Sequence, residues 1–152
     1  MREPCTIGEV MTPAPFTIEA DAPLRFARSI LLRARIHHLP VLERGRPIGL
    51  LTDSDLHLVS YLSSDLMSED SLTAGDICVP DPYVVGPEAP LAEVTGTLAR
   101  DRLGAAMIVV HGGLAGIFTC HDACRLVAEF HRAPAFALDP DPAPERGTSQ
   151  IP

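Results

Sequence analysis

The residues best suited to chemistry in this chain occur in one short element that is present twice. Residues 49–55 read Gly-Leu-Leu-Thr-Asp-Ser-Asp, and residues 116–122, 67 positions later, read Gly-Ile-Phe-Thr-Cys-His-Asp. In both, an apolar run typical of a strand leads into Thr-x-x-Asp at the start of a helical pattern. A Thr hydroxyl at the positive end of a helix suits a phosphate, and a carboxylate one turn later suits the hydroxyls of a ribose.

The same element has a purely structural interpretation. Thr-x-x-Asp before an apolar run is typical of a capping box, in which the two side chains satisfy free N–H groups of the first helical turn. That interpretation explains the Thr and the Asp of both copies, but it leaves Gly49 and Gly116 unexplained. A glycine inside a strand indicates that something approaches the backbone closely. The element alone therefore leaves both interpretations open.

Two further groups of residues could carry chemistry. His37 and His38 follow a helical pattern, and such a pair can donate hydrogen bonds to a phosphate and add positive charge when protonated. They could equally be two partly exposed histidines at a turn. Cys120 and Cys124 are one helical turn apart with His121 beside Cys120, but zinc normally takes three or four protein ligands. Half-buried cysteines are the simpler interpretation, so we predict no metal site.

The sequence around these residues also repeats at the same offset of 67 positions, which predicts two copies of one supersecondary unit. Each copy has the pattern strand, helix, strand, strand, helix. The predicted elements are 16–18, 24–34, 39–42, 48–51 and 52–62 in the first copy, and 83–85, 90–102, 106–110, 114–118 and 120–131 in the second. Asp21 is the expected cap of the helix that has Pro23 in its first turn. Gly96 costs about 1 kcal/mol inside a helix, so it predicts close packing there.

These elements predict an α+β fold. We expect two βαββα repeats packed about a pseudo-two-fold axis, each a small three-stranded sheet with helices on one face. The expected boundaries are 6–60 for the first repeat, 61–72 for a linker, 73–131 for the second repeat and 132–152 for a disordered Pro/Asp-rich tail. Because a copy of about 60 residues buries only a modest core, the copies should pack together.

The composition excludes several classes of function. The formal net charge is −8 and every basic residue is Arg, which argues against nonspecific nucleic-acid binding. No apolar run approaches the roughly 20 residues of a membrane span, and the N-terminus has no apolar signal segment, so we expect no membrane partner and a cytoplasmic location. The four Cys do not repeat between the copies, so a disulfide framework is not expected.

The double pattern resembles a tandem pair of cystathionine-β-synthase (CBS) domains, the Bateman module. Residues 10–13, Val-Met-Thr-Pro, look like the opening of such repeats, and residues 35–41, Arg-Ile-His-His-Leu-Pro-Val, look like their R-h-x-x-L-P-V segment. The Gly-x-x-Thr-x-x-Asp element is the third motif, and it is doubled. The resemblance covers roughly 6–60 and 73–129.

The resemblance implies a module that needs no cofactor but binds an adenosyl ligand: AMP, ADP or ATP, and less often S-adenosylmethionine or NAD. The residues that it places at the ligand are Ala14, Phe16, Ile36, His37, His38, Thr52, Ser54, Asp55, Asp81, Tyr83, Leu103, Thr119 and Asp122. In such modules the Thr and Asp contact phosphate and ribose, the lead-in to the first strand lies against the adenine, and the histidine positions reach the phosphate. The second copy has Gly104-Ala105 where the first has the histidine pair, so the two clefts are not expected to bind alike.

No arrangement of a nucleophile with a base, no close carboxylate pair and no phosphate-binding Gly-rich loop stands out, so we do not expect an enzyme. The first hypothesis is a regulatory module that binds an adenine nucleotide between its repeats and transmits occupancy to an unidentified target protein or to its own assembly. The resemblance also implies a homodimer, with the final helices 56–62 and 120–130 as the expected surface. The alternatives are an interaction scaffold that has lost its ligand, and a thiol-based metal or redox sensor.

Overall fold

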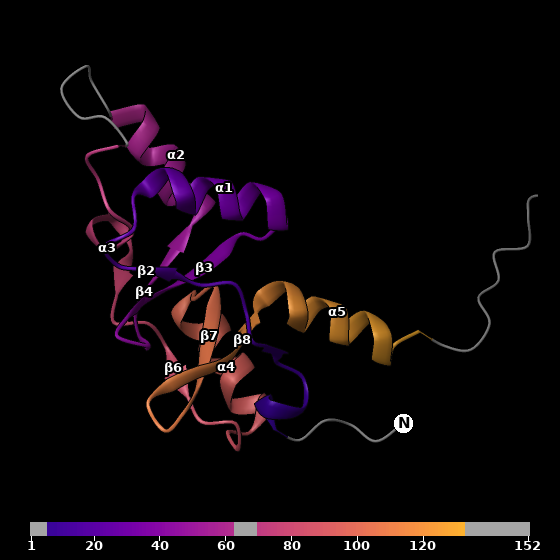
Figure 1. Cartoon of the computed structure of the whole chain (residues 1–152). Coiled ribbons are helices and arrows are strands. Elements are labelled where there is room, and N and C mark those ends of the chain that lie inside the picture. Colours follow the sequence, from indigo (N-terminus) through magenta and orange to yellow (C-terminus); the bar gives the residue numbers. More distant parts are fainter. Residues whose placement is uncertain (1–5, 63–69, 133–152) are drawn as a thin grey trace, which may run out of the picture.

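The computed structural model describes residues 6–62 and 70–132, which form two sheets and their covering helices (Figure 1). The first copy contains the 3-10 helix η1 (Ile7–Glu9), β1 (Thr12–Pro13), β2 (Ile18–Glu19), α1 (Leu24–Ala34), β3 (His38–Glu43), β4 (Arg46–Thr52) and α2 (Asp53–Leu62). The second contains α3 (Ala74–Ile77), β5 (Val79–Pro80), β6 (Val84–Val85), α4 (Leu91–Asp101), β7 (Ala105–Val110), β8 (Gly113–Thr119) and α5 (Cys120–Phe130). The α+β fold of two βαββα repeats is confirmed, while most of the predicted linker and the predicted tail lie outside the described residues.

Each sheet has four strands rather than the predicted three. The strand orders are β1-β8-β7-β6 and β2-β3-β4-β5, so the extra strand at one edge comes from the lead-in of the other repeat. β1 pairs antiparallel with β8, with Thr12 opposite Ile117, and β5 pairs antiparallel with β4, with Gly49 opposite Pro80. The prediction missed these strands because two residues that include a proline carry no alternating pattern.

The lead-in segments are exchanged between the repeats. Ile7 N–H donates to Ala89 O at 2.9 Å, and at the equivalent place Ala74 N–H donates to Ala22 O at the same distance. Ile7 and Ala74 are fully buried, each in the core of the other repeat. The matching contacts relate the repeats by an approximate two-fold axis.

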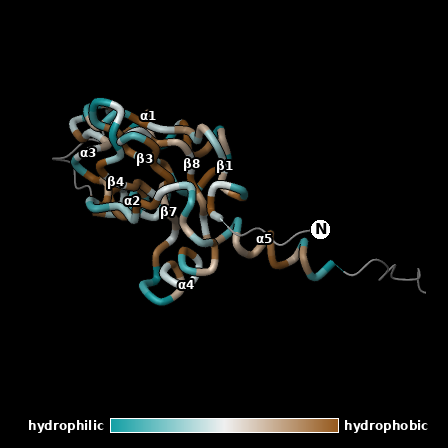
Figure 2. The backbone as a smooth tube through the Cα atoms, turned by 90° about the horizontal axis from the view of Figure 1, so that it is seen from below, coloured by the Kyte–Doolittle hydropathy of each residue, from teal (hydrophilic) through white to brown (hydrophobic). Residues whose placement is uncertain are grey.

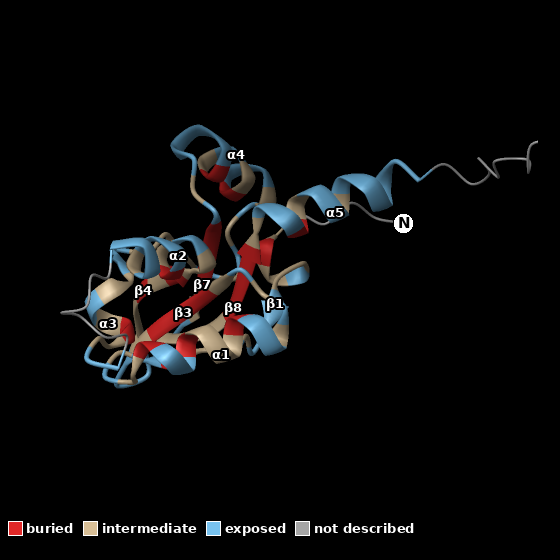
Figure 3. Ribbon diagram, turned by 90° about the horizontal axis from the view of Figure 1, so that it is seen from above, coloured by how far each residue is buried: buried red, intermediate tan, exposed pale blue. Residues whose placement is uncertain are grey.

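Two cores result, one for each sheet. Leu24, Ala27 and Leu31 on α1 are buried in one, and Val94 and Leu98 on α4 are buried in the other. Apolar residues follow the central strands (Figure 2), and these strands also carry much of the buried surface (Figure 3). By contrast, α5 extends away from the sheets, and most of its length is exposed (Figure 3).

Two local predictions are wrong. Asp21 does not cap α1: the N-cap is Pro23, and its side chain makes no capping hydrogen bond. Gly96 does not mark close packing, because it is exposed on α4 and a Cβ there would meet no heavy atom within 4 Å. Nothing in the packing of the described residues explains why a glycine stands at this position of the helix.

Close packing occurs instead at the strand glycines, and this can be tested. Gly116→Ala should lower the free energy of unfolding by about 1–3 kcal/mol, because the added Cβ would lie 3.0 Å from the Thr12 carbonyl oxygen. Urea denaturation measures the change. Gly96→Ala is the matched control and should raise stability by about 1 kcal/mol, since alanine favours the helix and fits there. Equal midpoints for Gly116→Ala and the parent chain would contradict this account of the lead-in contact.

Candidate functional site

Both copies of the Thr-x-x-Asp element form a capping box. Thr119 donates to Asp122 Oδ2 from its N–H and from its hydroxyl, both at 2.8 Å, and the Asp122 N–H donates back to Thr119 Oγ1 at 3.2 Å. Thr52 and Asp55 make the same three bonds. The structural interpretation of the element is therefore confirmed. Another such box starts α3, so a capping box does not by itself define a binding site.

The glycine of each element makes room for protein. A Cβ on Gly49 would lie 2.8 Å from the Val79 carbonyl oxygen and against the Cys78 sulfur, and a Cβ on Gly116 would contact the backbone of Thr12. The close approach that these glycines indicated is thus made by the exchanged lead-in strands. A ligand is not needed to explain it.

A cleft of about 290 Å³ lies where the start of α5 meets the first repeat, and we call it the histidine cleft. Its lining residues are Thr12, Pro15, Phe16, Arg35, Ile36, His37, His38, Ile117, Thr119, His121 and Asp122. The first copy supplies an aromatic ring, aliphatic groups and basic side chains, whereas the second copy supplies the capping box. The cleft is therefore built from both repeats.

The structure brings together six of the predicted site residues in this cleft: Phe16, Ile36, His37, His38, Thr119 and Asp122. Ala14 does not line it; it lies in the turn after β1 with a φ of 44°, and its N–H donates to Ala115 O at 3.1 Å. The remaining predicted residues are Thr52, Ser54, Asp55, Asp81, Tyr83 and Leu103, which also lie outside this cleft. Through the 67-residue repeat they are the counterparts of Thr119, His121, Asp122, Ala14, Phe16 and Ile36, and they mark the equivalent positions across the pseudo-two-fold axis.

Sequence reasoning missed five lining residues: Thr12, Pro15, Arg35, Ile117 and His121. Four of them, all except Pro15, lie inside motifs that the sequence analysis quoted, so those motifs were the available signal. Arg35 ends α1 in the left-handed conformation, with a φ of 53°, and this turn puts the next three residues at the cleft wall.

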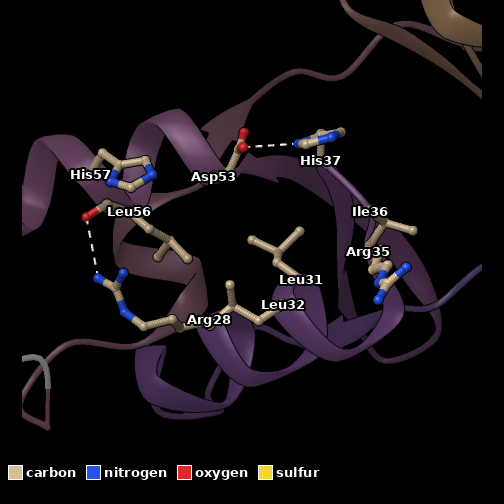
Figure 4. A pocket seen from close by; sticks show the side chains of 9 residues that line it. All are labelled: Arg28, Leu31, Leu32, Arg35, Ile36, His37, Asp53, Leu56 and His57. Atoms are coloured by element: carbon tan, nitrogen blue, oxygen red, sulfur yellow. Dashed lines mark hydrogen bonds and ion pairs between the residues drawn. The ribbon is translucent and has the colours of Figure 1, made fainter.

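His37 is held by an acidic residue at the start of α2. Its Nδ1 lies 2.8 Å from Asp53 Oδ2, and this bond is the main cause of an Asp53 pKa below its usual value (Figure 4). The side chain of His37 is nevertheless 74% exposed, so the ring is not confined by packing. A second cavity of about 310 Å³ opens between α1 and α2, and it shares Arg35, Ile36 and His37 with the histidine cleft (Figure 4).

His38 fills the space left by the missing side chain of Gly104. A Cβ on Gly104 would lie 2.5 Å from His38 Nε2, so the two repeats meet at this point. Gly104 occupies the position that His37 has in the first copy, so a side chain at this position would require the His38 ring to move. Burial, and then the neighbouring His37, hold the pKa of His38 below its usual 6.5 although nearby carboxylates oppose the shift. The net effect favours the neutral imidazole.

Asp122 is the one acidic residue among those that line the cleft, and 9% of its surface is exposed. Its Oδ2 accepts the two capping bonds, whereas its Oδ1 accepts only a long bond, 3.3 Å, from Arg125. The capping box thus fixes the carboxylate in place and leaves one oxygen able to accept a better donor.

Both cysteines of α5 are exposed, so the interpretation of them as half-buried is wrong. Cys120 donates from Sγ to Leu103 O at 3.2 Å. Among residues 6–62 and 70–132, no group of three or more His, Cys, Asp and Glu side chains is arranged to hold a metal ion. Within the same residues, no helix has the length and apolar character needed to span a membrane.

Comparison with known proteins identifies the family. The model of the CBS domain matches residues 7–60 and 74–129, and the chain therefore belongs to the CBS domain family. A comparison with curated proteins gave no match. The two matched segments correspond to the two copies of the repeat.

Several solved structures have the same fold. CBSX2 in complex with AMP has a TM-score of 0.74 at 22% identity, over 85% of this chain and all of that chain. The CBS domain pair of protein MJ0100, in complex with 5′-methylthioadenosine and S-adenosyl-L-methionine, has a TM-score of 0.73 at 19% identity, over 84% and 99%. The CBS domain of a bacterial CNNM/CorC family Mg²⁺ transporter in complex with ATP has a TM-score of 0.72 at 23% identity, over 82% and 87%.

The contact between His38 and Gly104 predicts a coupled pair of substitutions. Gly104→Ala alone should lower the free energy of unfolding by about 1–3 kcal/mol, because the methyl group collides with the imidazole ring. In a His38→Ala background the same change should cost less than half as much. Denaturation of the four proteins of this double-mutant cycle measures the coupling, and strictly additive effects would refute the contact.

Proposed function

We propose that this protein is a non-catalytic regulatory module that binds an adenosyl ligand of the AMP, ADP or ATP class in the histidine cleft. The observation that carries the proposal is the composition of that cleft. Phe16, Ile36 and Ile117 offer apolar surface to an adenine, and Asp122 offers its capped carboxylate to a ribose. The histidine side chains that line the same cleft are able to donate to a phosphate. Three structures of the same fold contain AMP, ATP or S-adenosylmethionine, which supports an adenosyl ligand.

We assign the residues as follows. The ribose hydroxyls donate to Asp122, whose Oδ1 exchanges its long bond with Arg125 for shorter ones. The Thr119 hydroxyl and the side chains of His37 and His38 contact the phosphate. S-adenosylmethionine and NAD are less favoured, because neither presents a terminal phosphate for the histidine pair to donate hydrogen bonds to.

The equivalent positions across the repeat keep Thr52, Ser54 and Asp55 but have Gly104 and Ala105 instead of the histidines. They lack the imidazole donors, so we propose one phosphorylated ligand for each chain. Asp81, Tyr83 and Leu103 are then available only to a weaker or uncharged adenosyl ligand. The boundaries 6–60 and 73–131 for the two repeats belong to the same proposal.

Isothermal titration calorimetry tests the assignment. AMP or ATP should bind with a stoichiometry near one for each chain, and Asp122→Ala should weaken binding by about tenfold or more, because ribose hydroxyls lose a charged acceptor. Asp76→Ala is the matched control, since it removes the same kind of capping box outside the histidine cleft and should leave affinity unchanged. Equal affinities for Asp122→Ala and the parent chain would refute the ribose assignment.

We further propose that the module is a homodimer that also presents a surface to a target protein. Leu58, Tyr61 and Leu62 on α2, and Val127 and Phe130 on α5, are large apolar residues exposed by 41–88%. The part of α5 that extends from the sheets adds to this surface (Figure 1). Because a ligand in the histidine cleft touches both repeats, its binding can favour one packing of the repeats and so alter the assembly.

Light scattering at micromolar concentration should therefore give twice the mass of one chain. A Tyr61→Glu, Val127→Glu double variant should give the monomer mass, because two charges would be buried in each half of the contact. Val110→Glu changes an exposed apolar residue of β7 outside both helices and should remain dimeric. A monomeric parent chain would exclude the proposed dimer.

The alternative is an interaction scaffold without a ligand. One observation favours it: capping boxes and lead-in contacts account fully for the repeated Gly, Thr and Asp residues. A ligand present at 100 times its dissociation constant should stabilise the fold by about 2.7 kcal/mol. Unchanged melting temperatures with AMP, ATP, S-adenosylmethionine and NAD would therefore favour the scaffold.

A further inference from the structure

His38 lies where the two repeats and their two ligand-binding elements meet. Its ring packs over Gly104, and it lines the histidine cleft together with Thr119 and Asp122. In the sheet, His38 is opposite Thr52, the first residue of the other capping box. This side chain is therefore the one through which a ligand in the histidine cleft would act on the contact between the repeats.

Charged and titratable groups surround the ring from several elements. His37 precedes it in the chain, and Asp53 and Asp55 at the start of α2 and Asp122 at the start of α5 are near enough to act on its charge. Two further residues, Arg35 and His121, line the same cleft. Burial and His37 favour the neutral imidazole, and the three carboxylates favour the charged form. The balance lowers the pKa of His38, yet the carboxylates that would stabilise its charged form are already in place.

We propose that His38 takes up a proton from solvent when an anionic ligand enters the histidine cleft, so that this residue makes the cleft select ligands by charge. The inference rests on the proposed nucleotide binding. An anion beside the imidazole favours the imidazolium, which raises the pKa of His38 in the complex above that of the free protein. The anionic ligand then binds more tightly at low pH, and the gain disappears as the pH rises past the pKa of the complex.

An uncharged ligand obtains no such gain, because it does nothing to favour the imidazolium. Selection between AMP and adenosine should therefore increase as the pH falls through the neutral range. One linked proton changes affinity by at most about tenfold for each pH unit. Gly104 contributes to this selection by charge, since a larger residue at position 104 would displace the His38 ring.

The direct test is an NMR titration of the histidine side chains of the full chain, alone and saturated with AMP or adenosine. In the free protein His38 should titrate below 6.5. With AMP its titration should move to higher pH, and with adenosine it should not. An identical His38 titration in the free protein and in the AMP complex would overturn the inference.

Calorimetry between pH 6.5 and 8.0 supplies the second test, with His38→Gln as the variant, because glutamine can donate a hydrogen bond but cannot take up a proton. AMP affinity of the parent chain should fall several-fold across this range, and that of His38→Gln should fall less. Protonation of the AMP phosphate is common to both proteins, so the difference reports His38. His57→Gln is the control: His57 lines only the neighbouring cavity, and its loss should preserve the full pH dependence.

The outcomes separate the two proposals. If AMP, ATP and adenosine all fail to bind, the proposed function falls and this inference falls with it. If AMP binds with the same pH dependence in the parent chain and in His38→Gln, only the proton uptake is refuted. If the pH dependence is lost in His37→Gln but kept in His38→Gln, the proton is taken up by His37, and the proposed proton uptake by His38 is refuted.

Discussion

Residues 6–13 leave the first repeat to complete the sheet and the core of the second, and residues 73–80 do the reverse. This exchange is a reciprocal set of backbone hydrogen bonds and buried side chains, and neither repeat has its fourth strand without it. Because β1 lies against β8 and β5 against β4, the exchange also determines which parts of the two copies face one another. The histidine cleft is a consequence, since it lies between the lead-in of one copy and the final helix of the other.

The exchange of the lead-ins is symmetric, but the contact between His38 and Gly104 makes the two ligand-binding positions different. His38 occupies the volume that a side chain on Gly104 would need, and the histidine pair is present in the first copy alone. The His38 ring thus contacts the second repeat at a point where the second copy has no equivalent ring to offer in return. Packing and chemistry are linked at this point, because the burial that fits the ring between the repeats also favours its neutral form.

Much of the fold could be predicted from the repeat. Helices such as α1 and α4 carry a buried stripe at helical spacing, and β3, β4, β7 and β8 are long enough to show apolar runs, so both classes were predicted near their observed positions. The two-residue strands β1 and β5 could not be predicted, since their partners are distant in sequence. The role of the caps was ambiguous because Thr-x-x-Asp has the same pattern at α3 and at α5. At α5 it lines the histidine cleft, whereas at α3 it does not.

The sequence by itself determined the two copies, their helices and long strands, the repeated Thr-x-x-Asp elements and the difference between His37-His38 and Gly104-Ala105. These are local properties, set by side-chain period, turn residues and residue identity. Only the tertiary structure decided that the first copy's histidines face the second copy's Asp122, and that Gly49 and Gly116 accommodate strands of the chain itself. The reason is that both depend on the exchange of the lead-ins, which is a contact between segments distant in sequence. Because the two copies carry the same pattern, no local signal shows which copy a lead-in will pair with.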